Sequence, residues 1–125
     1  VGVLGGSLWT TVVGAHHSFA AEYDINKPAV LTGTVTKLEW TNPHAWIFLD
    51  VKGADGTTEN WEIELGPPNT LFRYNWRRDT VKIGQTLTVD GYLSKDGLKR
   101  INSKIVTLTD GTKFESGSSA LRTTK

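Results

Sequence analysis

The 125-residue sequence contains no cysteine and only three histidines. Without cysteine the protein has no disulfide, no thiolate metal site and no cysteine nucleophile. A site for a transition metal would therefore depend on the few imidazoles, which are the commonest protein ligands for Cu(II), Zn(II) and Ni(II).

The chain also lacks an excess of charge. The sequence has fourteen Lys and Arg residues and thirteen Asp and Glu residues, which gives a formal net charge of +1. Proteins that bind duplex nucleic acid normally carry clustered basic residues, and so do proteins that bind anionic membranes through a polybasic patch. We therefore expect neither nucleic acid nor a membrane surface as a partner. The length is that of one domain, and it is long enough to bury a hydrophobic core without disulfides or a structural metal.

Familiar catalytic motifs are missing as well. The sequence has no G-x-S-x-G, no G-x-x-x-x-G-K and no H-E-x-x-H. Ser18 follows His17 directly, but sequence neighbours rarely reach the geometry of a catalytic triad. Glu62 and Glu64 share one face of a predicted strand, with Asp50 beside them on the preceding strand, and such a pair is most often a solvated face. We expect a protein that is not an enzyme.

The first fifteen residues, Val1 to Ala15, carry no charge and are mostly apolar or small. Their length matches the apolar part of a secretory signal and is too short for a bilayer span. Such a signal would direct the protein to the bacterial periplasm or beyond the cell, and cleavage after Ala15 would release the mature chain. The alternative is that this segment is a buried strand, covered if necessary by a neighbouring copy in a homo-oligomer. We divide the chain into this segment (1–15), a folded domain (16–115) and a flexible polar tail (116–125).

The folded domain is predicted to be all-β. Residues 29–41, 44–52, 57–65, 86–94 and 99–108 alternate apolar and polar side chains or are rich in β-branched ones, and residues 112–115 can add a short last strand. Two prolines and Asn69, a candidate N-cap, predict one short helix within residues 66–76. Three strands, a helix and two strands are the order of an OB-like, five-stranded Greek-key barrel. Gly33 would permit a bulge in its long first strand.

Several stretches resemble a known family. "AHHSFAAEYD", "GTVTKLEWTNPHAWIFLDV", "WEIELGPPNTLFRYNWRRDTVKIGQTLTVDGYLSKDG" and "VTLTDGTKF" resemble the bacterial exported proteins of the DUF6152 family, whose function is unknown. The resemblance runs from about His16 to Phe114, and the histidine pair and the W-T-N-P-H turn are its most specific parts. It implies a small periplasmic or secreted domain and no particular reaction.

All three histidines, His16, His17 and His44, lie in these motifs. If cleavage follows Ala15, the new amino terminus and the ring of His16 can chelate one metal, an arrangement similar to the histidine brace of certain copper proteins. If it follows Gly14, a histidine at the third position also suits Cu(II) or Ni(II). Either terminus could recruit His44, which makes copper the preferred cofactor. The plain alternative is a solvated pair, with His44 as a turn residue bonded to a backbone carbonyl.

A second set of residues predicts a different kind of binding. OB-type domains bind ligands on the second and third strands and the loops around them. In this region and in the segment after it lie aromatic and basic side chains: Trp40, Trp46, Trp61, Arg73 and Arg77. Aromatic rings beside arginines stack on flat ligands and hold anions. The alternative function is therefore a module for a small anion, a glycan or a protein partner. Most of these rings could also be core.

Overall fold

The computed structural model describes residues 19–117, which form an all-β domain. Residues 19–22 make one helical turn that leads into the first strand. The elements that follow are β1 (Tyr23–Glu39), β2 (Trp46–Lys52), β3 (Thr58–Glu64), α2 (Pro68–Arg73), β4 (Thr86–Ser94), β5 (Arg100–Leu108) and β6 (Lys113–Glu115). The predicted all-β class and the helix between the third and fourth strands are confirmed.

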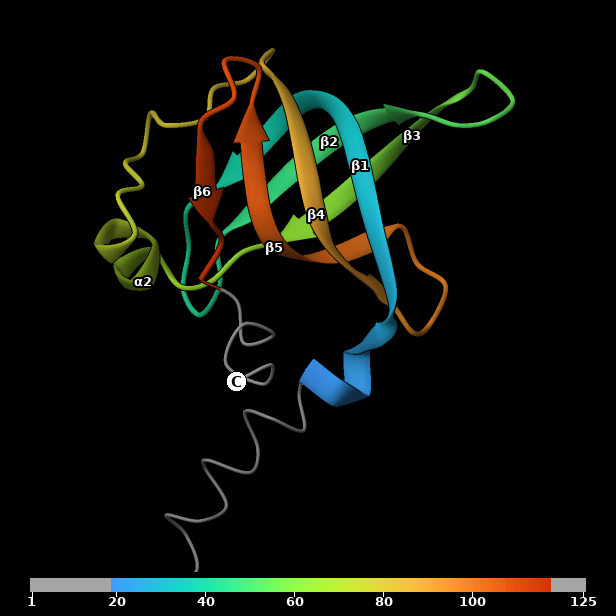
Figure 1. The fold of residues 1–125 in the computed structure, drawn as a ribbon, viewed down its shortest axis with the longest axis horizontal. Helices are drawn as coiled ribbons and strands as arrows, with labels where there is room; N and C mark the ends of the chain where they lie inside the picture. Colours follow the sequence, from blue (N-terminus) through green and yellow to red (C-terminus); the bar gives the residue numbers. More distant parts are fainter. Residues whose placement is uncertain (1–18, 118–125) are drawn as a thin grey trace, which may run out of the picture.

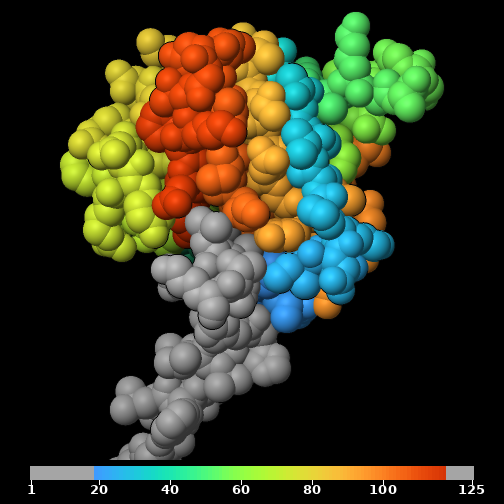
Figure 2. All heavy atoms as spheres, viewed as in Figure 1, coloured from blue at the N-terminus to red at the C-terminus, as the bar shows by residue number. Residues whose placement is uncertain are grey.

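The strands form a closed ring (Figure 1). Their order is β3-β2-β1-β4-β5, and a parallel pairing of β3 with β5 joins the two ends, while β6 adds to the outer side of β5. All other neighbours are antiparallel. This is the strand order expected for an OB-like domain. The hairpin that joins β2 to β3 extends beyond the ring and stands out from the body of the molecule (Figure 2).

β1 is longer than the sequence predicts, because it starts at Tyr23 and not near Ala29. The first part of β1 contains several polar residues and Pro28, so it does not show the apolar alternation that predicts a strand. A register shift separates Tyr23 from Pro28 in the ladder with β4, so the proline stands where regular pairing resumes. The early start brings Tyr23 to the far end of β4, opposite Ser94.

Gly33 allows the backbones of β1 and β2 to approach closely, but the bulge predicted at Gly33 lies further along β1. The register between β1 and β2 shifts between Val35 and Lys37, two residues beyond the predicted place. A Cβ on Gly33 would press on the carbonyl oxygen of Asp50 and lie 2.9 Å from a methyl carbon of Val51. After the bulge the alternation is reversed, so that Leu38 packs against the core.

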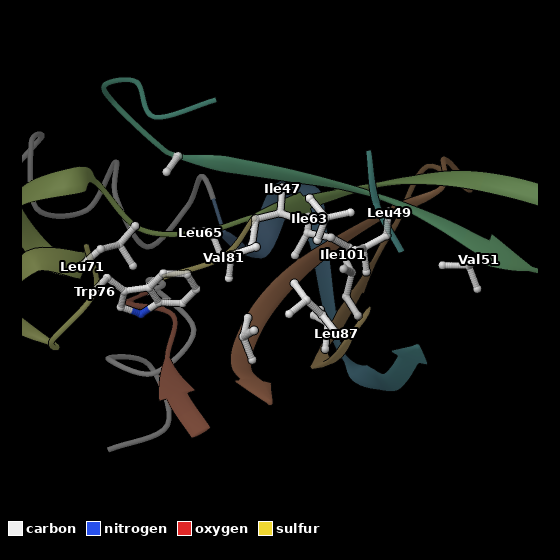
Figure 3. Close-up of a cluster of buried hydrophobic side chains, with 14 residues drawn as sticks. Ile47, Leu49, Val51, Ile63, Leu65, Leu71, Trp76, Val81, Leu87 and Ile101 are labelled. Atoms are coloured by element: carbon white, nitrogen blue, oxygen red, sulfur yellow. The ribbon is translucent and has the colours of Figure 1, made fainter. Parts of the chain in front are cut away.

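The interior of the ring is a single apolar cluster (Figure 3). Ile47, Leu49, Ile63 and Ile101 lie at its centre and are fully buried. Trp76 lies towards one end of the cluster. Its indole N–H donates to the carbonyl oxygen of Glu115 over 2.8 Å, and its ring packs on Trp40 and Phe114. Trp76 therefore ties the segment after α2 to β6.

The predicted N-cap of the helix is wrong. α2 begins at Pro68, with Pro67 at the N-cap position and no side-chain cap, so Asn69 lies inside the first turn. Proline suits the first helical position because its missing N–H would be unpaired there anyway. Of the tail predicted from residue 116, Ser116 and Gly117 are described. Ser116 is buried against Ser103, with 2.6 Å between the two hydroxyl oxygens.

The close approach at Gly33 predicts that Gly33→Ala lowers the free energy of unfolding by about 1–3 kcal/mol, because the added methyl overpacks the contact between β1 and β2. Thr34→Ala, at the exposed neighbouring position, should cost less. Urea unfolding followed by tryptophan fluorescence measures both. Equal losses in the two variants would contradict the role assigned to Gly33.

Candidate functional site

Glu64 is a buried carboxylate at the end of β3. Its neighbours Ile63 and Leu65 belong to the core, so Glu64 points away from the interior of the ring. It is nevertheless only 7% exposed. The expectation of a solvated acidic face holds for Glu62, which pairs with Arg100 at 2.8 Å, and is wrong for Glu64.

Three side chains surround the Glu64 carboxylate. His44 bonds one oxygen through Nδ1, at 2.7 Å, and the Asn102 amide donates to the other oxygen over 2.9 Å. The Tyr23 hydroxyl lies near enough for the carboxylate to alter its pKa, although it makes no hydrogen bond of ordinary geometry within the described chain. We call Tyr23, His44, Glu64 and Asn102 the Glu64 cluster.

Backbone pairing places each member of the cluster. The parallel register of β3 and β5 sets Glu64 beside Asn102. His44 lies near the end of the loop between β1 and β2. Two hydrogen bonds hold this loop to the residues that follow β3, from Leu65 N to the Ala45 oxygen (2.9 Å) and from Ala45 N to the Gly66 oxygen (3.1 Å). The cluster thus joins four segments, namely the start of β1, the loop between β1 and β2, β3 and β5.

Electrostatics favour the charged forms of the Glu64–His44 pair. Burial tends to raise the pKa of Glu64, but the hydrogen bond and positive charge of His44, together with the polar contacts of Asn102 and Tyr23, outweigh it, and the pKa is lowered. The hydrogen bond to Glu64 raises the pKa of His44 despite the desolvation of the ring. Burial, followed by the negative charge of Glu64, raises the pKa of Tyr23 well above its ordinary value.

The geometry leaves one nitrogen of His44 available. The side chain is 37% exposed, and Nδ1 is the ring atom bonded to Glu64. A carboxylate on one ring nitrogen fixes the orientation and tautomer of an imidazole and makes the other nitrogen more basic. Metal-binding histidines are commonly held in this way. The arrangement is able to present Nε2 of His44 to a ligand.

The helical turn at residues 19–22 packs beside the cluster. Phe19 stacks on Tyr23 with 5.9 Å between the ring centroids, and both rings meet Tyr92 in a small apolar group. The backbone of Lys95 donates to the Glu22 oxygen over 2.8 Å, which fixes the turn to the loop between β4 and β5. Glu22 contributes to the raised pKa of His44.

Of the predicted metal ligands, only His44 can be placed, because His16 and His17 lie outside the described residues. Within residues 19–117, no three His, Cys, Asp or Glu side chains gather as a metal-binding group. The same stretch contains no helix of the length and apolarity that crossing a membrane would require.

The predicted aromatic and arginine residues separate into two groups. Trp40, Trp46 and Arg77 line one hollow of about 300 Å³. Trp61 packs against the core, and Arg73 lies outside this hollow with its guanidinium 3.4 Å from the Thr70 hydroxyl. Trp76 and Arg78, which belong to the same aromatic and basic segment of the sequence, line this hollow as well.

Sequence reasoning missed Glu64 as the partner of His44, and it missed Asn102 and Tyr23 as neighbours of the Glu64 carboxylate. A usable signal was the stretch "WEIEL", where Glu64 stands between two core residues at the end of a strand. No comparable signal marks Asn102 or Tyr23, because Asn102 meets Glu64 only through the pairing of β3 with β5, and Tyr23 only through the closure of the ring.

The model of a protein family described as "Family of unknown function (DUF6152)" matches residues 7–102. The chain belongs to the DUF6152 family. This confirms the resemblance found in the sequence motifs. The matched residues of this DUF6152 protein include all three histidines and every member of the Glu64 cluster. A comparison with curated proteins found no similar sequence.

The Glu64–His44 pair predicts a stability that depends on pH. The raised pKa of His44 contributes stability that is complete below its ordinary pKa of 6.5 and is lost as pH rises through the folded-state value. The lowered pKa of Glu64 contributes stability that is complete above its ordinary 4.5 and is lost as pH falls through the folded-state value. The pair therefore stabilises most between these two ordinary values.

We expect the wild-type protein to be more stable at about pH 5.5 than at about pH 8.5, by up to about 1 kcal/mol since solvent screens the part-exposed ring. His44→Gln should remove this difference, and His17→Gln should preserve it. Urea unfolding at the two pH values measures the effect. A pH dependence unchanged in His44→Gln would exclude the pair as its source.

Proposed function

We propose that this DUF6152 protein is an exported metal-binding protein in which His44 supplies one imidazole ligand to a divalent ion, with copper preferred. The supporting observation is the 2.7 Å hydrogen bond between His44 Nδ1 and the buried Glu64 carboxylate. It orients the ring and leaves Nε2 as the donor, as in known carboxylate–histidine–metal arrangements. Asn102 holds the second carboxylate oxygen and so keeps Glu64 in place.

The other ligands in this proposal are His16 and His17. His17 precedes Phe19 by two residues, and two residues of chain span at most about 7 Å. Phe19 stacks on Tyr23, whose hydroxyl neighbours Glu64, the partner of His44. The described start of the chain therefore lies on the same side of the domain as His44. Two or three imidazoles, with or without the terminal amine, form a nitrogen-rich set that suits Cu(II).

Binding without catalysis is part of the proposal. In the described part of the chain, the His44 ring is hydrogen-bonded to a carboxylate and to no serine or threonine hydroxyl. A serine or threonine nucleophile would need its hydroxyl within hydrogen-bond reach of the histidine base. The pair is thus arranged to orient an imidazole ligand.

Calorimetric titration with Cu(II) and Zn(II) tests the proposal on the exported form. We expect one-to-one binding that His44→Gln weakens at least tenfold, and that Glu64→Gln weakens by about 10–100-fold because the ring loses its orienting carboxylate. Glu62→Gln is the matched control, since Glu62 lies on the same strand and pairs with Arg100 instead. Its affinity should equal the wild type.

Two outcomes would contradict this proposal. Tight binding that is unchanged in His44→Gln would mean a chelate at the chain terminus alone. Absence of binding would remove the metal function altogether.

Export makes a separate prediction. Removal of Val1–Ala15 would expose the amine of His16, and intact mass of the protein recovered from the periplasm should then correspond to a chain that begins at His16. A chain that begins at Ala15 would keep a copper-binding terminus with different ligands. Retention of residues 1–15 would exclude the terminal amine from the site.

A further inference from the structure

A second candidate site lies between the start of β2 and the segment after α2. It adjoins the Glu64 cluster, because its lining residue Trp46 is paired with Glu64 across β2 and β3. Its main hollow has a volume of about 300 Å³ and is lined in part by Trp40, Trp46, Trp76 and Val81, with Arg77 and Arg78 beside them. A second hollow of about 430 Å³ shares Trp40, Trp76 and both arginines and extends to Phe72 on α2. Together they are within the size range of small-molecule sites.

The apolar wall of the main hollow is built from fixed side chains. Trp76 is 1% exposed and is anchored by its hydrogen bond to the Glu115 oxygen. Trp40 packs on it, with 6.3 Å between the ring centroids and a tilt of 41°. Trp40 is itself only partly buried and packs against the core. A flat ligand would therefore meet a preformed aromatic surface.

The two arginines differ in what holds them. The Arg77 guanidinium donates to the carbonyl oxygens of Trp76 (2.7 Å) and Phe72 (3.3 Å), and it stacks on the Phe72 ring at 3.9 Å. The Arg77 guanidinium is therefore already engaged in contacts with Phe72 and Trp76. The exposed Arg78 makes no side-chain hydrogen bond or ion pair with any residue between 19 and 117.

The charged side chains at this place are all basic. Among residues 19–117, no Asp or Glu lines either hollow. A guanidinium beside an apolar, aromatic wall favours a ligand that combines a flat apolar body with one anionic group, because the ring system stacks while the anion pairs with the fork of the guanidinium.

We propose that this hollow binds small organic anions with a flat apolar body, with the rings against Trp40 and the acid group on Arg78. None of the lining residues belongs to the Glu64 cluster, so the proposed anion binding does not use the imidazole of His44.

Two fluorescent probes test the proposal on the full domain. 1-Anilinonaphthalene-8-sulfonate carries a sulfonate, and N-phenyl-1-naphthylamine has the same ring system without it. We expect Arg78→Gln to weaken binding of the sulfonate at least tenfold and to leave the uncharged probe unchanged. Arg73→Gln is the matched control, because Arg73 lies just before these residues but lines neither hollow. It should leave both affinities unchanged.

The position of the probe is read from the indole N–H signals in a two-dimensional NMR spectrum. On addition of the sulfonate, the signals of Trp40 and Trp46 should shift and that of Trp61 should not. Equal loss of sulfonate binding in Arg73→Gln and Arg78→Gln would mean non-specific attraction and would overturn the proposal. So would failure of the folded wild-type protein to bind the sulfonate.

Discussion

The parallel pairing of β3 with β5 is the contact on which the rest of this domain depends. It joins the two ends of the strand order, and its register sets Glu62 opposite Arg100 and Glu64 opposite Asn102. Without it, β3 would be an open edge with unpaired backbone groups. With it, the interior of the ring is enclosed, and a carboxylate is brought beside an amide that satisfies one of its oxygens.

That closure explains why a charged side chain is tolerated at a buried position. An isolated buried carboxylate is strongly disfavoured, whereas one with charged and polar partners is accepted. Asn102 and His44 supply these partners from two other segments, and Tyr23 covers the remaining side. Removing one partner would leave the others desolvated and unpaired, which costs more than the pair contributes. The Glu64 cluster therefore orients His44 rigidly.

Both proposed sites use the margins of the ring. The Glu64 cluster lies where the loop between β1 and β2 meets β3 and the helical turn at residues 19–22. The arginine and tryptophan hollow lies where the start of β2 faces the segment after α2. In each case a rigid sheet holds a side chain on a connecting segment, which is how small domains commonly position binding residues. The two proposals assign ligands of opposite charge to the two sites, a cation to His44 and an anion to Arg78.

Local pattern in the sequence determined the all-β class, the place of α2 and the inward side of β2, because alternation and turn residues act over a few neighbours. It also marked His44 and the aromatic segment as chemically distinctive. The tertiary structure alone decided that Glu64 is buried, that Asn102 and Tyr23 surround it, and that Arg77 is committed while Arg78 is free within residues 19–117. The contact between Glu64 and Asn102 depends on strand register between segments about forty residues apart. Register is set by the fit of whole strands to one another, and no local stretch of sequence contains it.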